Sequence, residues 1–207
     1  MKKNHLLLAV FVMGGFTAFA QPGAAVSTTK ETKLPPSKVD FDAFDSLTRE
    51  VKEYRKNRLV SLVQFLSFAK EKNTIILDTR SAEMYNRKHI KGAVHLNFSD
   101  FTETNLRRLI PSPGTRILIY CNNNFADDQV TFATKSYSPR LSEQKKPITL
   151  ALNIPTFINL YGYGYKNVYE LSDLVSVFSG SIQFEGTDVL NQTSRKGASR
   201  VRSSAAR

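Results

Sequence analysis

RILIYC, residues 116–121, is the clearest strand in the sequence. Its residues are apolar at consecutive positions, which is typical of a strand buried on both faces of a parallel sheet. The apolar run ends directly on Cys121. In open α/β sheets, ligands bind beyond the carboxyl ends of the strands. The cysteine therefore falls where such folds place their chemistry.

The segments around this strand alternate between expected strands and expected helices. Further strands are predicted at 58–60, 74–77, 93–97 and 167–171. Helices are predicted at 61–70, 81–88, 97–109 and 154–161, with a short one at 130–135. This alternation between residues 58 and 186 predicts an α/β domain with a mostly parallel sheet, interrupted by a polar inserted loop at about 136–150.

Both ends of the chain differ in composition from this domain. Residues 1–20 read as a signal peptide, with a charged start, an apolar stretch too short for a membrane span, and a small-x-small cleavage pattern. We therefore expect an exported protein, most simply periplasmic, with no membrane anchor after signal removal. Residues 21–38 read as a linker and 187–207 as a disordered basic tail.

An amphipathic helix is expected over residues 39–57. Phe41, Phe44, Leu47, Val51 and Tyr54 recur at spacings of three and four, which places them on one helical face. We expect this helix to pack on the main domain as an N-terminal extension.

The net charge of +11 does not by itself indicate a nucleic-acid partner. Two basic residues lie among the first 20 residues of the chain. The last 21 residues contain five basic residues and one acidic residue, Asp188. The intervening part of the chain therefore carries a net charge of about +5. A balance of this size is typical of a solvated surface, and no nucleic-acid partner is expected.

Three stretches of the sequence resemble parts of the rhodanese-like domain family. Residues 77–85, LDTRSAEMY, followed by 89–96, HIKGAVHL, resemble its first signature, an Asp-x-Arg at a strand end followed by His-Ile-x-Gly-Ala. The strand that ends on Cys121 resembles the one that carries the catalytic cysteine of the family. Residues 164–171, GYKNVYEL, are similar to the stretch that introduces its last strand.

This resemblance implies a three-layer α/β fold with a central five-stranded parallel sheet. It also implies that Cys121 attacks a sulfur donor, carries the sulfur as a persulfide and passes it to an acceptor. The substrate-binding loop would be Asn122, Asn123, Asn124, Phe125, Ala126 and Asp127, with Asp78, Arg80 and His89 in supporting positions. Backbone N–H groups of such a loop would favour the thiolate, which is the nucleophile.

The loop after Cys121 departs from the pattern of active sulfurtransferases, which usually carry Gly and Arg or Lys there. Residues 122–128 contain no cation and two carboxylates, Asp127 and Asp128. Asp127 also stands where phosphatase relatives need Arg, which makes phosphatase chemistry improbable. The insertion offers Arg140, Lys145 and Lys146 as alternative cations.

Several residues have two interpretations. Cys121, the one cysteine of the chain, is either a reactive thiol or an inert buried residue. For Asp78 and Arg80 the sequence favours a structural ion pair over a functional role, and for His89 packing at a helix end over a catalytic base. His95 reads as a strand residue, and Tyr161, Tyr163 and Tyr165 as tyrosines around a turn.

Three functions follow from these alternatives. The first is a sulfurtransferase that works through a persulfide on Cys121, and the second is a catalytically weak rhodanese-like module. The third is a redox-sensitive thiol that forms mixed disulfides. The expected partner is a small sulfur donor or thiol substrate, or an unidentified protein. No metal-ligand spacing is present, so neither a metal nor another cofactor is expected.

Overall fold

The computed structural model describes residues 34–137, 148–149 and 151–189. The chain separates into a unit of residues 1–39 and a unit of residues 40–207, and the second carries the fold. The expected signal peptide and most of the expected linker lie outside the described residues. Within the described ranges, no helix is long and apolar enough to cross a bilayer.

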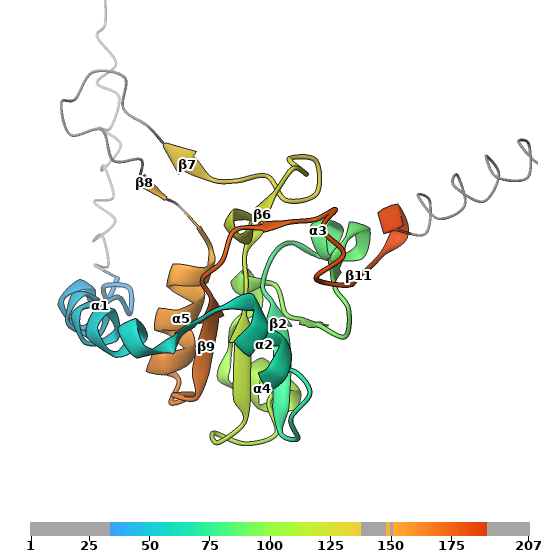
Figure 1. Ribbon diagram of the computed structural model, residues 1–207. Coiled ribbons are helices and arrows are strands. Elements are labelled where there is room, and N and C mark those ends of the chain that lie inside the picture. Colours follow the sequence, from blue (N-terminus) through green and yellow to red (C-terminus); the bar gives the residue numbers. More distant parts are fainter. Residues whose placement is uncertain (1–33, 138–147, 150, 190–207) are drawn as a thin grey trace, which may run out of the picture. The chain divides into compact units, whose positions relative to one another are not determined.

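A five-stranded, all-parallel sheet forms the centre of the second unit (Figure 1). Its strands, in spatial order, are β1 (Leu59–Val60), β9 (Val168–Leu171), β5 (Arg116–Ile119), β2 (Thr74–Asp78) and β4 (Val94–His95). The central strand β5 pairs in register with both neighbours, Ile117 opposite Ile75 and Val168. The predicted five-stranded parallel sheet is confirmed.

The alternation of side chains along β5 produces a core on each face of the sheet. Leu118 and Tyr120 belong to one hydrophobic cluster, whereas Ile117 and Ile119 belong to the other. Successive residues of a strand point to opposite faces, so one apolar run can fill both cores. This explains why residues 117–119 are apolar at every position.

Helices cover both cores. The first cluster receives Phe65 of α2 (Leu62–Phe68), with Tyr85 of α3 (Ala82–Arg87) packed against it. The second receives Val51 of α1 (Phe41–Arg55), Leu106 of α4 (Glu103–Leu109) and Phe157 of α5 (Asn153–Gly162). The architecture is therefore a sheet between two helical layers.

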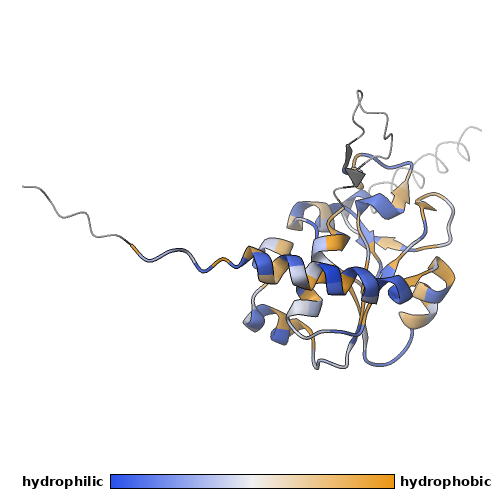
Figure 2. Ribbon diagram, turned by 90° about the vertical axis from the view of Figure 1, so that its left-hand side faces the viewer, coloured by the Kyte–Doolittle hydropathy of each residue, from blue (hydrophilic) through white to orange (hydrophobic). Residues whose placement is uncertain are grey.

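Only the C-terminal half of the apolar face of α1 is buried. Val51 is 2% exposed and the Tyr54 ring meets the Tyr161 ring edge-on at 4.9 Å, whereas Phe41 and Phe44 are exposed. Figure 2, in which α1 faces the viewer, shows apolar and polar residues mixed along its visible turns. The helical face was predicted correctly, but the core begins at Leu47, so the first turn of α1 with Phe41 and Phe44 stays exposed.

Short strand pairs and 3-10 turns complete the described part of the chain. The pairs are β6 (Phe125–Ala126) with β10 (Val175–Ser176), β3 (His89–Ile90) with β11 (Phe184–Glu185), and β7 (Ser136–Tyr137) with β8 (Ile148–Thr149). The 3-10 turns are η1 (Lys56–Arg58), η2 (Phe98–Asp100) and η3 (Asn122–Asn124). The last pair, β7 with β8, stands at the two ends of the predicted insertion.

Two local predictions were wrong. Residues 130–135 form no helix, because Phe132 turns inward, fully buried against the rings of Phe125 and Phe184. Residues 187–189 are helical, although the tail was expected to be disordered, and Asp188 forms an ion pair with Arg87 at 3.0 Å. The rest of the tail lies outside the described residues.

Candidate active site

Cys121 lies two residues beyond the end of β5 and is 3% exposed. Its backbone N–H donates to Asn124 Oδ1 at 2.9 Å, which closes the 3-10 turn η3. Its sulfur accepts the N–H of Leu152, with 3.3 Å between N and Sγ. In the capping box of η3, the backbone N–H of Asn124 also meets the Cys121 side chain. Leu152 immediately precedes α5, so its N–H comes from the far side of the insertion.

The three asparagines after Cys121 fasten the loop to other segments. Asn122 Nδ2 donates to the carbonyl of Ala133 at 3.0 Å, and Asn124 Nδ2 donates to that of Leu171 at 2.8 Å. Asn123 Oδ1 accepts the backbone N–H of Lys135 at 3.2 Å. An asparagine side chain both donates and accepts, so it can replace missing backbone partners in a turn. These side chains stabilise the loop.

The last positions of the expected substrate loop have separate environments. Phe125 is fully buried in the core, and Ala126 belongs to strand β6. Asp127 is exposed and adopts a left-handed backbone with φ 68°. Asp128 pairs with Lys88 at 2.9 Å. Burial of Asp128 opposes its ionisation, but hydrogen bonds from Lys88 and Thr131 outweigh burial and lower its pKa.

Asp78 and Arg80 form a buried ion pair at 2.7 Å, with 0% and 4% exposure. Tyr120 donates its hydroxyl to the same carboxylate. Burial disfavours the charged guanidinium, but the hydrogen bonds and charge of Asp78 prevail and raise the pKa of Arg80. Burial, followed by the charge of Asp78, raises the pKa of Tyr120 well above its usual value. The arrangement is the structural ion pair that the sequence favoured.

Arg80 also connects the end of β2 to the cysteine loop. Its Nη1 donates to Asn122 Oδ1 at 3.2 Å and to the carbonyl of Thr131 at 3.0 Å. Its Nη2 donates to the carbonyl of Lys88 at 2.7 Å. A planar guanidinium with five donors can hold several acceptors in fixed directions. Arg80 therefore acts on Cys121 through the loop and does not contact the sulfur.

His89 and His95 stack on the two sides of Tyr85, with ring centroids 3.8 and 4.8 Å away. His89 Nδ1 donates to the carbonyl of Tyr85 at 2.6 Å, and His95 Nε2 donates to that of Arg80 at 2.8 Å. His89 thus packs at the end of α3 and faces Tyr85 and Glu185 instead of Cys121.

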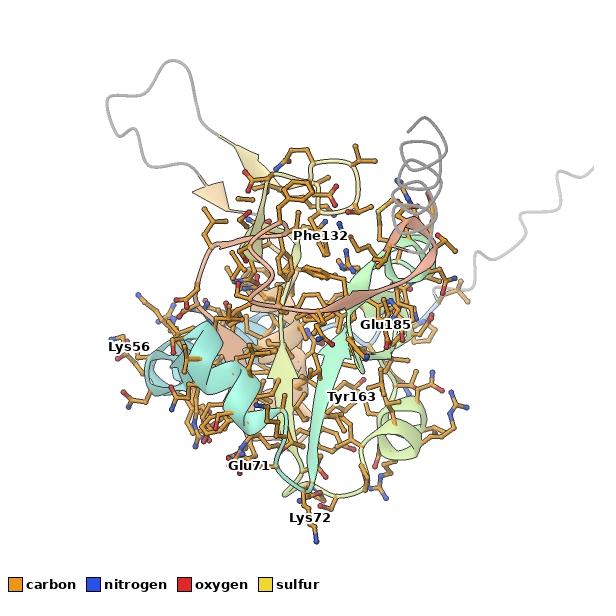
Figure 3. The ribbon with its side chains drawn as sticks, turned by 45° about the vertical axis from the view of Figure 1, so that its right-hand side comes forward. Lys56, Glu71, Lys72, Phe132, Tyr163 and Glu185 are labelled. Carbon is orange, nitrogen blue, oxygen red and sulfur yellow. The ribbon has the colours of Figure 1, made fainter. Side chains whose placement is uncertain are left out.

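The predicted tyrosine cluster lies at the other end of α5. Leu152 precedes this helix and Tyr163 follows it, so about 15 Å of helix separates the tyrosines from the sulfur. Tyr163, labelled in Figure 3, is half-exposed, whereas Tyr161 and Tyr165 are buried. The three alternative cations Arg140, Lys145 and Lys146 lie outside the described residues.

A cavity of about 400 Å³ lies against the loop that follows Cys121, with Asn123 and Asn124 among its walls, although Cys121 itself does not line it. Ala151, from the far side of the insertion, also lines it. Three further wall residues are charged or polar and were not singled out from the sequence: Arg55, Asn153 and Glu170. Arg55 holds the Glu170 carboxylate with two bonds of 2.5 and 2.6 Å, and Asn153 donates to the same carboxylate. In the sequence, the sign of this Arg55–Glu170–Asn153 cluster is a charged residue, Glu170, inside the otherwise apolar strand β9.

In the described part of the chain, no group of His, Cys, Asp and Glu side chains is arranged to hold a metal ion. The polar groups around Cys121 are amides, hydroxyls and ion pairs. This set of groups is suited to thiol chemistry or to hydrogen bonding of a small molecule.

Comparison with known proteins places this site in a family. A model of the rhodanese-like domain matches residues 61–173, more than half of the chain. No curated protein matches the sequence.

Several solved structures are similar to this chain at low identity. The BH2092 protein from Bacillus halodurans is 19% identical, with a TM-score of 0.42, covering 71% of this chain and 88% of that one. The Alr3790 protein from Anabaena sp. is 18% identical, with a TM-score of 0.38, covering 66% and 87%. A rhodanese with anions from E. coli is 14% identical, with a TM-score of 0.34, covering 55% and 99%. Because the family model spans more than half of the chain, this protein belongs to the rhodanese-like domain family.

Proposed function

We propose that Cys121 accepts sulfane sulfur from a small donor and carries it as a persulfide. The observation that carries the proposal is the position of the sulfur at the carboxyl end of the central strand. There the N–H of Leu152 lies 3.3 Å from Sγ and a cavity adjoins the loop. A hydrogen bond to the anionic form of a thiol favours that form, and the thiolate is the nucleophile.

The transfer involves two displacements at sulfur. The Cys121 thiolate attacks the outer sulfur of a persulfide donor, a new S–S bond forms, and the donor's own S–S bond breaks to release a thiolate. An acceptor nucleophile then takes the outer sulfur and restores the Cys121 thiolate. No oxidant or reductant is consumed in either step.

A second function, a binding module without efficient catalysis, is favoured by the burial of the sulfur. Cys121 is 3% exposed, and the side chains of Asn122 and Asn124 are engaged in the loop. Attack on a donor requires the donor to reach Sγ in line with the breaking bond. The residues that cover Sγ therefore have to move before sulfur can be transferred.

Intact-mass measurement after exposure to persulfide donors and to thiosulfate separates the candidates. We expect a slow gain of one sulfur atom in the wild type and none in the matched variant Cys121→Ser. A gain equal to the whole thiol compound would indicate the redox-sensitive thiol instead. No sulfur gain with any donor, while iodoacetamide still alkylates Cys121, would reject sulfur transfer in favour of the binding module.

A further inference from the structure

A second cavity, of about 390 Å³, lies on the face of the sheet that α2 covers, and none of the loop residues 121–128 lines it. Its walls come from α2 and the residues just after it, from β2, from β3 and from residues 180–183. Figure 3 shows strand β11, which carries Glu185, crossing in front of the sheet. Because α2 is only seven residues long, it shares this face with the C-terminal segment, and space remains between the two.

Aliphatic side chains make up much of the wall of this cavity. Leu66 lines it from α2, and the buried side chains of Ile76, Ile90 and Ile182 line it from the other segments. Sites for small molecules are mostly apolar cavities of about 300–1,000 Å³, so this one has the size of a small ligand. Water against aliphatic walls has few hydrogen-bond partners, and its displacement by an apolar group is favourable.

Two lysines also line this cavity, Lys70 just after α2 and Lys91 just after β3, and both are exposed. In the part of the chain that the structure describes, neither ammonium group has a hydrogen bond or an ion pair. A lysine can lay its aliphatic stem along an apolar wall and keep its charge at the mouth. Two uncompensated positive charges at one apolar cavity favour a ligand that joins an anion to an apolar body.

The acids of the neighbouring segments do not neutralise these lysines. None of the described residues that line the cavity is acidic. Glu71, next to Lys70 in the sequence, pairs with Arg116 at 2.5 Å, and Glu185 accepts the backbone N–H of Gly92 at 3.3 Å. An amine in this cavity would therefore meet only like charge, whereas a carboxylate would meet two opposite charges.

We propose that this cavity binds a small organic carboxylate. Its apolar body lies against Leu66, Ile76 and Ile182, and its carboxylate faces the ammonium groups of Lys70 and Lys91. The site shares no residue with the loop that follows Cys121, so the inference does not depend on sulfur transfer.

The test compares two probes of the same size that differ in charge, 3-phenylpropionate and its neutral amide, 3-phenylpropanamide. Their binding to the full-length protein is followed by NMR titration. Exposed ion pairs are individually weak, so two of them predict that the carboxylate binds about fivefold more tightly than the amide. This ratio should shrink at about 1 M salt, where exposed charges are screened. The double variant Lys70→Met with Lys91→Met should bring the ratio to near one.

Lys72→Met is the matched control, because Lys72 is exposed, lies two residues from Lys70 and does not line the cavity. Figure 3 shows its side chain at the lower end of the molecule, pointing away from the sheet. This variant should leave the fivefold ratio unchanged. Ala69→Leu enlarges a wall residue and should weaken the binding of both probes, with circular dichroism used to verify that each variant is folded.

Three results would overturn the inference. The first is that neither probe binds, and the second is that the two probes bind equally well. The third is a preference for the carboxylate that survives the loss of both lysines or the Ala69→Leu substitution, since the probe would then occupy another part of the protein.

Discussion

Replacing Arg80 with Met removes the side chain that joins the end of β2 to the cysteine loop. Asp78, fully buried, would lose its counter-charge and keep only the Tyr120 hydroxyl and the backbone N–H of residue 80. The carbonyls of Lys88 and Thr131 and the oxygen of Asn122 would each lose a donor. The substitution therefore leaves a buried charge and several buried acceptors without compensation.

The expected loss is large relative to the stability of a domain. Breaking a buried ion pair by removing one partner costs about 3–5 kcal/mol. Total unfolding free energies are about 5–15 kcal/mol, so Arg80→Met removes a substantial share. With a urea slope of about 2 kcal/mol per molar, the unfolding midpoint should fall by about 2 M.

Urea unfolding, monitored by circular dichroism, measures this loss of stability. Two further variants show which interaction is responsible for it. Arg107→Met is the matched control, because its ion pair with Glu103 is exposed on both sides and should cost under about 0.5 kcal/mol. The double variant Asp78→Asn with Arg80→Met removes both charges and should be less unstable than the sum of the single variants. Native-state alkylation of Cys121 should be faster in Arg80→Met, because Asn122 has lost one of its anchors.

Two results would refute this reasoning. A loss below about 1 kcal/mol for Arg80→Met would mean that Asp78 finds another way to be neutralised. A double variant as unstable as the sum of the single variants would mean that the two side chains are not coupled.

Two further predictions concern the segments around the site. The lowered pKa of Asp128 means that its pair with Lys88 stabilises the fold fully above the ordinary pKa of about 3.9 and is lost as the pH falls through the folded-state value. Asp128→Asn should therefore cost roughly 1 kcal/mol at pH 7 in chemical denaturation, and the difference from wild type should vanish at low pH; a constant difference would contradict the linkage. Gly186→Ala should be strongly destabilising, because its φ is 125° and a Cβ would meet the carbonyl oxygen of Arg87 at 2.4 Å. Gly180→Ala is the control, because Gly180 has φ 70° but no heavy atom within 4 Å of the added Cβ. It should cost only about 1–2 kcal/mol of stability in the same thermal unfolding series. Equal losses of stability for the two variants would contradict the role of the close contact at Gly186.

The architecture was predictable because its determinants are local in the sequence. A strand buried on both faces is apolar at consecutive positions, and residues 117–119 show this without any knowledge of their neighbours. The amphipathic spacing of residues 41–54 likewise predicted α1. Periodicity states which residues share a face, but not how far the partner surface extends, so it could not reveal that Phe41 and Phe44 stay exposed.

The shortest strands were not predicted, because their determinants are not local in the sequence. The two-residue strands β6, β10 and β11 are too short for an alternation of side chains to be visible. Residues 130–135 have the composition of a helical turn, but burial of Phe132 against two rings from other segments decides their path. Tertiary packing overrides local propensity where a large aromatic residue has a place in the core.

Local patterns in the sequence are enough to place a cysteine just beyond the end of a buried strand in a parallel sheet. The surroundings of that cysteine depend on contacts between distant segments, since the Leu152 N–H on its sulfur lies 31 residues away and the Arg55–Glu170 pair spans 115 residues. Hydrogen bonds and ion pairs of this kind depend on distances in space that no local periodicity encodes. The sequence supplies the thiol, and the packing of α1 and α5 against the sheet supplies the cavity beside the loop that follows it.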